Sequence, residues 1–355
     1  MLLRWLSTNF YSELRYIHLE RDSMLSKKEI LETLDSVILG GTRTGLVSKN
    51  LVRDVILKDG IIHIVIANTG LTPDTEETFK ENIRNVIGED TGFKKIDIAF
   101  EEVKPAEINN VKHVIVVMSG KGGVGKSLVS GLLAVSLKRR GKQVGILDAD
   151  IAGPSIPRMF GLAGPVPGFG HAIIPLESKS GIEVISMNLL LENESDPVIW
   201  RGPIISNAIT QFWQDTLWGN LDYLVIDLPP GTTDASLTVM QSLPVTGIVI
   251  VTTPQDLVEM IVKKAVNMVK EMNKPVIGVI ENMSYFRLPG TDEKIEIFGR
   301  SRAEEIARDI GVPLLGRLPV DPEIARLCDE GNIESYESDS LQALGNSFSW
   351  AITKK

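Results

Sequence analysis

Short apolar runs alternate with longer stretches of helical spacing from residue 113 almost to the end of the chain. Apolar runs of about four to eight residues bounded by turn residues are typical of strands buried on both faces. Such runs occupy residues 113–118, 144–148, 182–186, 223–227, 247–252, 276–281 and 313–317. Alternation of strands and helices predicts an α/β fold with a mostly parallel sheet covered by helices on both faces.

The preceding part of the chain has a different, more compact pattern. Ser26, followed three residues later by Glu29, is a capping box, which predicts the start of a helix. Two alternating runs joined by a turn at residues 58–60 predict a hairpin. The expected elements are a helix to residue 37, strands over 52–57 and 61–67, a loop over 71–76, a helix over 77–87 and a strand over 95–101.

These patterns divide the chain into domains. We expect a small α/β domain over residues 26–104, a linker over 105–112 and a larger domain over 113–355. Residues 1–25 carry aromatic side chains but no continuous apolar core of the kind a signal peptide needs. Met24 directly precedes the capping box, so two alternatives are open: translation starts at Met24, or residues 1–25 form a tail.

A glycine-rich stretch lies between the first long apolar run and the following helical run. Its last residues fit the pattern G-x-x-x-x-G-K-S, in which backbone N–H groups surround phosphate oxygens, the lysine neutralises phosphate charge and the serine hydroxyl meets Mg²⁺. The preceding strand and following helix favour this interpretation over a turn that binds nothing, because a helix N-terminus attracts anions. The expected nucleotide-binding residues are Gly120, Lys121, Gly122, Gly123, Val124, Gly125, Lys126 and Ser127.

Acidic residues collect at the carboxyl ends of the predicted strands, where ligands of such sheets bind. Asp148 and Asp150 follow one strand: we expect Asp148 in the Mg²⁺ shell and Asp150 to orient the attacking water. Alternatively, one of the two caps the next helix. Asp227 ends another buried strand and is expected to act with Ser127 on Mg²⁺. The loop over 228–234 begins at this Mg²⁺ residue, which suits a sensor of the γ-phosphate.

These motifs resemble those of known ATPases. The loop with its extra lysine, Lys121, resembles the deviant Walker A loop of the MinD/ParA-like ATPases, in which that lysine is taken to reach the partner's nucleotide. Residues 227–234, with blocks at 199–203, 218–223 and 278–284, are similar to the Mrp/ApbC family of iron–sulfur cluster carriers. The resemblance implies an Mg²⁺-dependent ATPase that dimerises across ATP and transfers clusters to apoproteins, with Lys121 and Asp150 catalytic.

Two further features are interpreted through this resemblance. Asn282 ends the strand over 276–281 and would hydrogen-bond adenine, for which an amide with both donor and acceptor is suited. A plain strand-capping asparagine is the alternative. The small domain resembles the iron–sulfur-assembly domain found in front of Mrp-type ATPases. However, that family's acidic turn and loop cysteine have no counterpart near 40–45 or 71–75, so we expect a structural or docking role.

The chain departs from the family at one motif. Leu288 and Thr291 occupy the positions at which Mrp-type proteins carry C-x-x-C, and neither side chain ligates iron as a thiolate does. The single cysteine, Cys328, lies beside Leu327 and is expected to face the core. We identify no Fe–S ligands. Two functions stay open: a cluster carrier, or an ATP-gated dimeric switch or docking factor that carries no cluster.

The composition of the chain argues against nucleic acids and membranes as binding partners. The net charge of −9 argues against a general nucleic-acid binder, because phosphate contacts need clustered Lys and Arg. The same acidity disfavours a ParA-like partition ATPase, a third interpretation. A single cysteine fits a reducing compartment, and no apolar run approaches the roughly 20 residues of a membrane span. We therefore expect a cytoplasmic protein that binds neither nucleic acid nor membranes.

Overall fold

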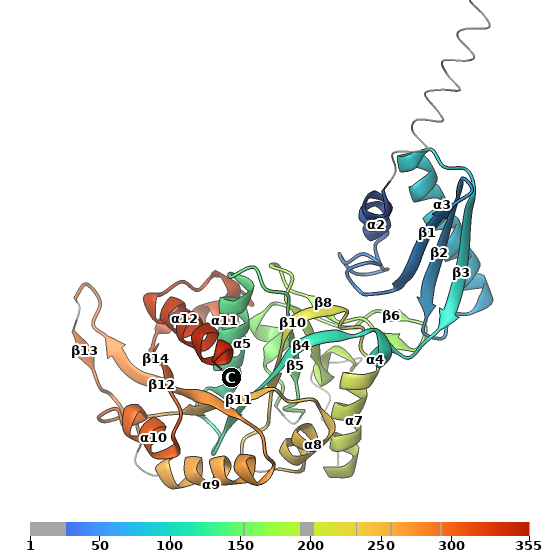
Figure 1. Ribbon diagram of the computed structural model, residues 1–355. Coiled ribbons are helices and arrows are strands. Elements are labelled where there is room, and N and C mark those ends of the chain that lie inside the picture. The colour runs from blue at the N-terminus through green and yellow to red at the C-terminus, as the bar shows by residue number, and fades with distance from the viewer. Residues whose placement is uncertain are drawn as a thin grey trace, which may run out of the picture. The chain divides into compact units, whose positions relative to one another are not determined.

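The computed structural model describes residues 26–151, 153–191, 202–231, 233–255, 258–291 and 293–354 (Figure 1). The chain divides into two compact units. The small unit contains the described residues up to Ile108 together with Phe169–Ala172, and the large unit contains the rest. The expected tail at 1–25 and the block at 199–201 lie outside the described residues.

The small unit is a three-stranded sheet with helices α2 (Lys27–Asp35) and α3 (Pro73–Thr91). Strands β1 (Val52–Lys58) and β2 (Ile61–Asn68) form an antiparallel hairpin, and β3 (Ile96–Glu102) pairs parallel with β2. The capping box of α2 is confirmed: Ser26 N donates to the Glu29 carboxylate at 2.7 Å, and Glu29 N donates to Ser26 Oγ.

Several boundaries in this part of the chain differ from the prediction; for example, α2 ends at Asp35 and not at residue 37, and α3 continues to Thr91, beyond residue 87. The helix expected to start at residue 77 starts at Pro73, because Thr72 caps it and proline fits the first turn of a helix without losing a hydrogen bond. The predicted loop over 71–76 is therefore mostly helical. The expected linker over 105–112 contains the short helix α4 (Pro105–Ile108) and the first residues of β4 (Asn110–Ser119).

The large unit is built on a nine-stranded sheet of order β13-β12-β11-β4-β10-β5-β9-β8, with β14 paired to β12. Only β13 and β8 pair antiparallel among its described strands. Every strand predicted from the sequence is present, which confirms the fold class. The bounds are β5 (Val144–Asp148), β8 (Leu176–Glu177), β9 (Glu183–Ser186), β10 (Asn220–Asp227), β11 (Gly247–Thr252), β12 (Val276–Arg287), β13 (Lys294–Ile295) and β14 (Leu314–Val320).

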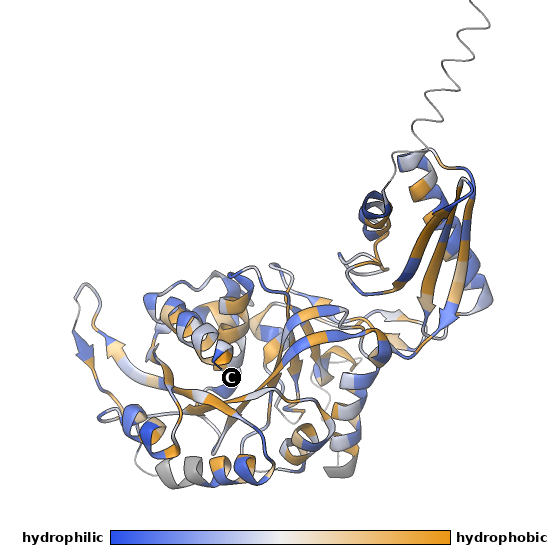
Figure 2. Ribbon diagram, viewed as in Figure 1, coloured by the Kyte–Doolittle hydropathy of each residue, from blue (hydrophilic) through white to orange (hydrophobic). Residues whose placement is uncertain are grey.

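Both faces of this sheet are covered by helices. Alternate residues of β4 enter two separate hydrophobic clusters: Val116 joins residues of α7, α8, α9 and α10, and Val117 joins residues of α5, α11 and α12. Burial on both faces explains the nearly continuous apolar runs, visible as orange strands in Figure 2. The helices are α5 (Lys126–Lys138), α7 (Gly202–Gln214), α8 (Asp234–Ser242), α9 (Val258–Glu271), α10 (Ala303–Ile310), α11 (Pro322–Asp329) and α12 (Asp339–Thr353).

Several short elements carry no periodic signal in the sequence. They are the helix α6 (Ile156–Met159), the two-stranded pair β6 (Gly168–Phe169) and β7 (Ala172–Ile173), and the 3₁₀ turns η1 (Met187–Leu189) and η2 (Ile333–Ser335). Phe169 is buried in the small unit, where its ring packs edge-on against Phe79 at 5.4 Å between centroids. The chain therefore returns to the small unit after forming part of the large one.

Candidate nucleotide-binding site

The glycine-rich loop joins β4 to α5 as predicted. Gly123 and Gly125 adopt positive φ angles of 78° and 75°, a region that glycine enters without steric cost, and Gly125 is the N-cap residue of α5. The loop borders a cavity of about 280 Å³ that is also lined by Asp150, Ser155 and Pro230. The N-terminus of a thirteen-residue helix therefore opens onto a cavity that Lys126 and Asp150 also line, an arrangement suited to phosphate.

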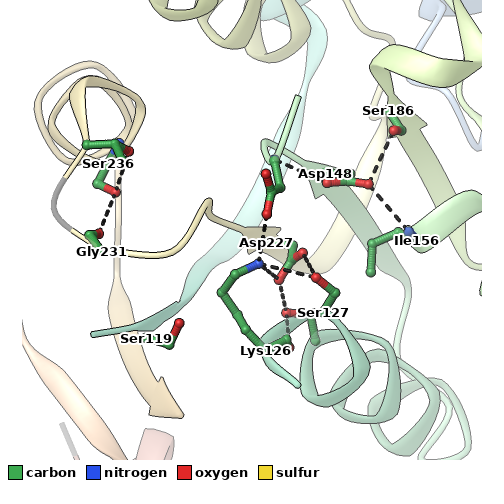
Figure 3. Close-up of polar contacts among 12 residues, drawn as sticks. Ser119, Lys126, Ser127, Asp148, Ile156, Ser186, Asp227, Gly231 and Ser236 are labelled. Atoms are coloured by element: carbon green, nitrogen blue, oxygen red, sulfur yellow. Dashed lines mark hydrogen bonds and ion pairs between the residues drawn. The ribbon is translucent and has the colours of Figure 1, made fainter. Parts of the chain in front are cut away.

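Asp227 lies at the centre of the charged groups beside this loop (Figure 3). Its carboxylate is completely buried at the end of β10, and Lys126 Nζ lies 2.8 Å from Oδ1. Two hydroxyls of α5 donate to the same carboxylate, Ser127 Oγ to Oδ2 at 2.5 Å and Ser130 Oγ to Oδ1 at 2.6 Å. Sequence reasoning missed Ser130, although its position one helical turn after Ser127 was a usable signal.

The two acids after β5 occupy different environments. Asp150 lines the cavity, with Oδ2 3.9 Å from Lys126 Nζ. Burial raises the pKa of Asp150, while the Lys126 ammonium acts in the opposite direction. Asp148 is fully buried. Burial and the neighbouring Asp227 charge raise the pKa of Asp148 to about 8.

The Asp148 carboxylate is engaged by three donors from the surrounding backbone and strand. Ser186 Oγ and Ile156 N donate to Oδ2 at 3.2 and 3.4 Å, and Asp150 N donates to Oδ1 at 3.2 Å. These contacts fix the start of the loop that carries Asp150 and cap the first residue of α6. The geometry thus favours the helix-capping alternative for Asp148.

The loop after β10 is tied to the phosphate-binding loop. Gly231 N donates to Ser119 O at 3.0 Å, and Ser236 Oγ in α8 donates to Gly231 O at 3.3 Å. The ring of Pro230 lies against Gly122, where a Cβ would be 3.7 Å away. Thr232, within the expected sensor loop, lies outside the described residues. The described contacts connect the loop to both the P-loop strand and the following helix.

Lys121 and Asn282 contact groups that sequence reasoning did not anticipate. Lys121 Nζ donates to the side-chain oxygen of Gln255, which follows β11. Asn282 is 1% exposed, and its Nδ2 donates to Val124 O in the glycine-rich loop at 3.0 Å. Both expected nucleotide-site residues therefore lie against, or within, the loop.

The two positions that replace the family's cysteines form the tip of a hairpin. β12 continues to Arg287, beyond its expected end, and pairs antiparallel with β13. Leu288 and Thr291 lie in the turn between them, where Thr291 N and Oγ1 both donate to Leu288 O at 3.1 Å. This turn offers an exposed leucine and a hydroxyl where the family has thiols.

The cysteine of the chain lies on another element. Cys328 is half-buried on α11 and packs against the core cluster that includes Leu327. Burial, reinforced by Asp329, raises the pKa of the Cys328 thiol to about 11. Across the described ranges, no group of three or more His, Cys, Asp and Glu side chains is arranged to hold a metal ion.

Comparison with known proteins identifies the family. The family model of the NUBPL iron-transfer P-loop NTPases, of the ParA group, matches residues 110–351. The chain belongs to this family. The iron–sulfur cluster carrier protein of Aquifex aeolicus is 39% identical over 340 residues, covering 86% of this chain and 91% of that protein. The carrier of Clostridium perfringens is 48% identical over 239 residues, covering 65% and 84%.

A solved structure that contains ADP is also similar to this chain. The nucleotide-binding protein of Archaeoglobus fulgidus in complex with ADP is 44% identical, with a TM-score of 0.59, and covers 65% of this chain and 91% of that one. Together, these matches confirm the resemblance to the Mrp/ApbC-type iron–sulfur carriers and the P-loop NTPase class. In the described part of the chain, no helix has both the length and the apolar character required to cross a bilayer.

Proposed function

We propose that this chain is an Mg²⁺-dependent ATPase that binds ATP between two copies of itself and acts in the delivery of iron–sulfur clusters to apoproteins. The observation that carries the proposal is the convergence of Lys126, Ser127 and Asp227 at the N-terminus of α5, with Asp150 across the cavity. Phosphoryl transfer depends on positioning and charge stabilisation, and these groups supply both.

The residues beside the loop fit Mg²⁺. Ser127 Oγ and Asp227 Oδ2 lie 2.5 Å apart, so a hydroxyl and a carboxylate, both hard oxygen ligands, are adjacent. Bound Mg²⁺ would neutralise charge on the β- and γ-phosphates. The amides of residues 120–127 and the Lys126 ammonium would hold the phosphates. We propose that Asp148, predicted as an Mg²⁺ residue, acts on this site by fixing the Asp150 loop.

Asp150 is proposed to accept a proton from the attacking water. A general base works best when its pKa lies near the operating pH, and burial moves the pKa of Asp150 upward, in that direction. Its carboxylate also lies on the cavity, within 3.9 Å of the Lys126 ammonium. That position suits a water aligned with the γ-phosphate.

Lys121 is proposed to act on the nucleotide of a second copy. Lys126 already serves the phosphates from within the loop, and the exposed Lys121 side chain is held by Gln255 outside it. A second cation on the same loop is thus free of the internal charge network around Asp227. This arrangement, together with the family, supports a homodimer whose assembly requires ATP.

A second candidate function follows from the 288–291 turn. A [4Fe–4S] cluster normally takes four thiolates. This chain has one cysteine, so a dimer supplies two at most, and the residues of the turn do not fit the cluster. The second candidate is an ATP-gated docking factor that serves cluster delivery without holding the cluster on its own side chains.

Three measurements test the proposal. ATP hydrolysis with and without Mg²⁺, and light scattering with ATP and Mg²⁺, test the ATPase and the dimer; absence of turnover or a persistent monomer would reject these roles. Anaerobic reconstitution with iron and sulfide, followed by desalting, separates the two candidates. Roughly four irons per dimer, lost in Cys328→Ser, identifies a carrier that uses its own thiol. No retained iron favours the docking factor.

A further inference from the structure

The middle of β12 reaches the phosphate-binding loop, although β11 lies between β12 and β4 in the sheet. Asn282 makes the contact, donating from Nδ2 to Val124 O at 3.0 Å in a buried environment. A carbonyl can only accept, so the amide nitrogen must face the loop. One of the two N–H groups of this side chain is therefore committed to protein backbone.

Gly125 shows how close the approach is. A Cβ at this position would lie 2.2 Å from Asn282 Nδ2, a separation that no side chain could tolerate. Gly125 also has a φ of 75° and is the N-cap residue of α5. Its position sets the direction of the first free N–H groups of the helix, the groups that face an anion. Asn282 thus contacts the loop beside Gly125, the residue that sets the direction of the N–H groups expected to bind phosphate.

The strand is bent at this point and clamped on its other side. Met283 has a φ of 54°, which is uncommon for a residue with a side chain, and the pairing of β12 with β14 shifts between Glu281 and Tyr285. Ser284 Oγ donates to the buried Glu281 carboxylate at 2.5 Å and accepts from Arg317 Nε at 2.8 Å. Strained backbone persists where its surroundings hold it, and such places cluster at functional sites.

We propose that Asn282 is a positioning residue that holds Val124 and Gly125 in the conformation that binds phosphate. It then supports the phosphate chain of every nucleoside triphosphate, whatever its base. The proposal rests on the proposed nucleotide-binding function and assigns the recognition at this residue to the phosphate chain.

Asn282→Asp tests the proposal with a side chain of the same shape. It replaces the donor with an oxygen that faces Val124 O, so the contact becomes repulsive. ATP and ITP, which lacks the exocyclic amine of adenine, are titrated by calorimetry into the wild type and the variant. Both affinities should fall by the same factor, roughly tenfold, so that their ratio is unchanged. Without nucleotide, amides of residues 120–127 should exchange with deuterium faster.

Other outcomes overturn the proposal. A weakened ATP affinity with unchanged ITP affinity would make Asn282 a base reader, and unchanged exchange of the loop amides would remove the supporting role. Failure of the wild type to bind either nucleotide would reject the proposed function, while the exchange measurement still tests the loop contact. Asn282→Ala removes the donor without adding repulsion. It should lower both nucleotide affinities and speed exchange of the loop amides, but by less than Asn282→Asp.

A matched control is available in the small unit. Asn68 is 5% exposed and donates from Nδ2 to Glu76 Oε1 at 2.7 Å, so it too is a buried amide with a committed donor. Asn68→Asp makes the same isosteric change away from the nucleotide site. It should leave both nucleotide affinities and the exchange of residues 120–127 unchanged.

Discussion

The phosphate-binding loop and the 288–291 turn differ in how strongly their surroundings constrain them. Beside the loop, the buried charges of Lys126 and Asp227 satisfy each other and are supported by two serine hydroxyls. At the turn, Leu288 is exposed, and the Thr291 hydroxyl bonds to backbone of the same hairpin, donating to Leu288 O and accepting from Glu293 N. Removing one partner of a buried ion pair is costly, whereas an exposed turn can change at little cost to stability.

This difference separates two parts of the family's function within one domain. The residues expected to bind nucleotide converge beside the loop, while Leu288 and Thr291 stand where the resemblance predicts cysteines. Both parts nevertheless meet on β12, which carries Asn282 against the loop and continues to Arg287 at the turn. β12 therefore connects the residue that contacts the loop with the turn at residues 288–291.

The largest expected effect concerns Asp150. Asp150→Ala should bind ATP normally and hydrolyse it more slowly by roughly 10² to 10⁴, because the attacking water loses its base. An ATP-bound dimer should accumulate, measurable by light scattering and single-turnover hydrolysis. Asp227→Ala is the contrasting variant, since it should lower the apparent Mg²⁺ affinity. Unchanged steady-state turnover in Asp150→Ala would reject the assignment.

The two loop lysines provide the next test. Lys126→Ala should weaken ATP binding by roughly 10², because a charge-assisted contact with the phosphates is lost and Asp227 keeps a buried unpaired charge. Lys121→Ala should retain most of the binding, yet lose ATP-dependent dimerisation and turnover. Calorimetry and light scattering on both variants measure these effects. Equal losses of affinity in the two variants would contradict separate roles.

Cysteines introduced at positions 288 and 291 should give the turn the iron ligands that it lacks. In Leu288→Cys combined with Thr291→Cys, a dimer offers four thiolates from two turns, enough for one [4Fe–4S] cluster. We expect roughly two irons per monomer after anaerobic reconstitution, against little in the wild type. ATPase activity should change little, since both side chains lie at an exposed turn. Iron content equal to that of the Thr291→Cys single variant would show that the turns do not meet.

The sequence predicted the sheet well because its strands are buried on both faces. The bounds 144–148 and 247–252 agree with β5 and β11, where turn residues flank the apolar run. The end of β12 was missed because Asn282 and Ser284 interrupt the apolar pattern, and the bend at Met283 depends on tertiary contacts. Strand periodicity cannot indicate that a strand continues past such a bend.

The candidate site was predictable in its residue types but not in all of its contacts. The loop pattern, Asp150 and Asp227 follow from motifs with fixed spacing, and the structure places both acids beside Lys126 of the loop. The contacts of Asp148 with Ser186 and Ile156 depend on how β9 and α6 pack, which local sequence does not specify. For the same reason, the sequence could not distinguish an Mg²⁺ residue from a helix-capping one.

The smallest expected effect concerns Cys328. Burial raises its pKa to about 11, above the value of about 8.5 for a free cysteine, so little thiolate forms near pH 8. Ellman's reagent at pH 8 should therefore react with native protein at least about tenfold more slowly than with protein in denaturant. Because the folded-state pKa is the higher one, this thiol should weaken stability as pH rises from about 8.5 towards 11, and Cys328→Ser should remove that component. Denaturant titrations across this pH window measure whether the free energy of unfolding falls as pH rises. Reaction in the native state as fast as in denaturant would make Cys328 an accessible thiolate, and with it a competent iron ligand, which would narrow the difference between this chain and its cysteine-bearing relatives.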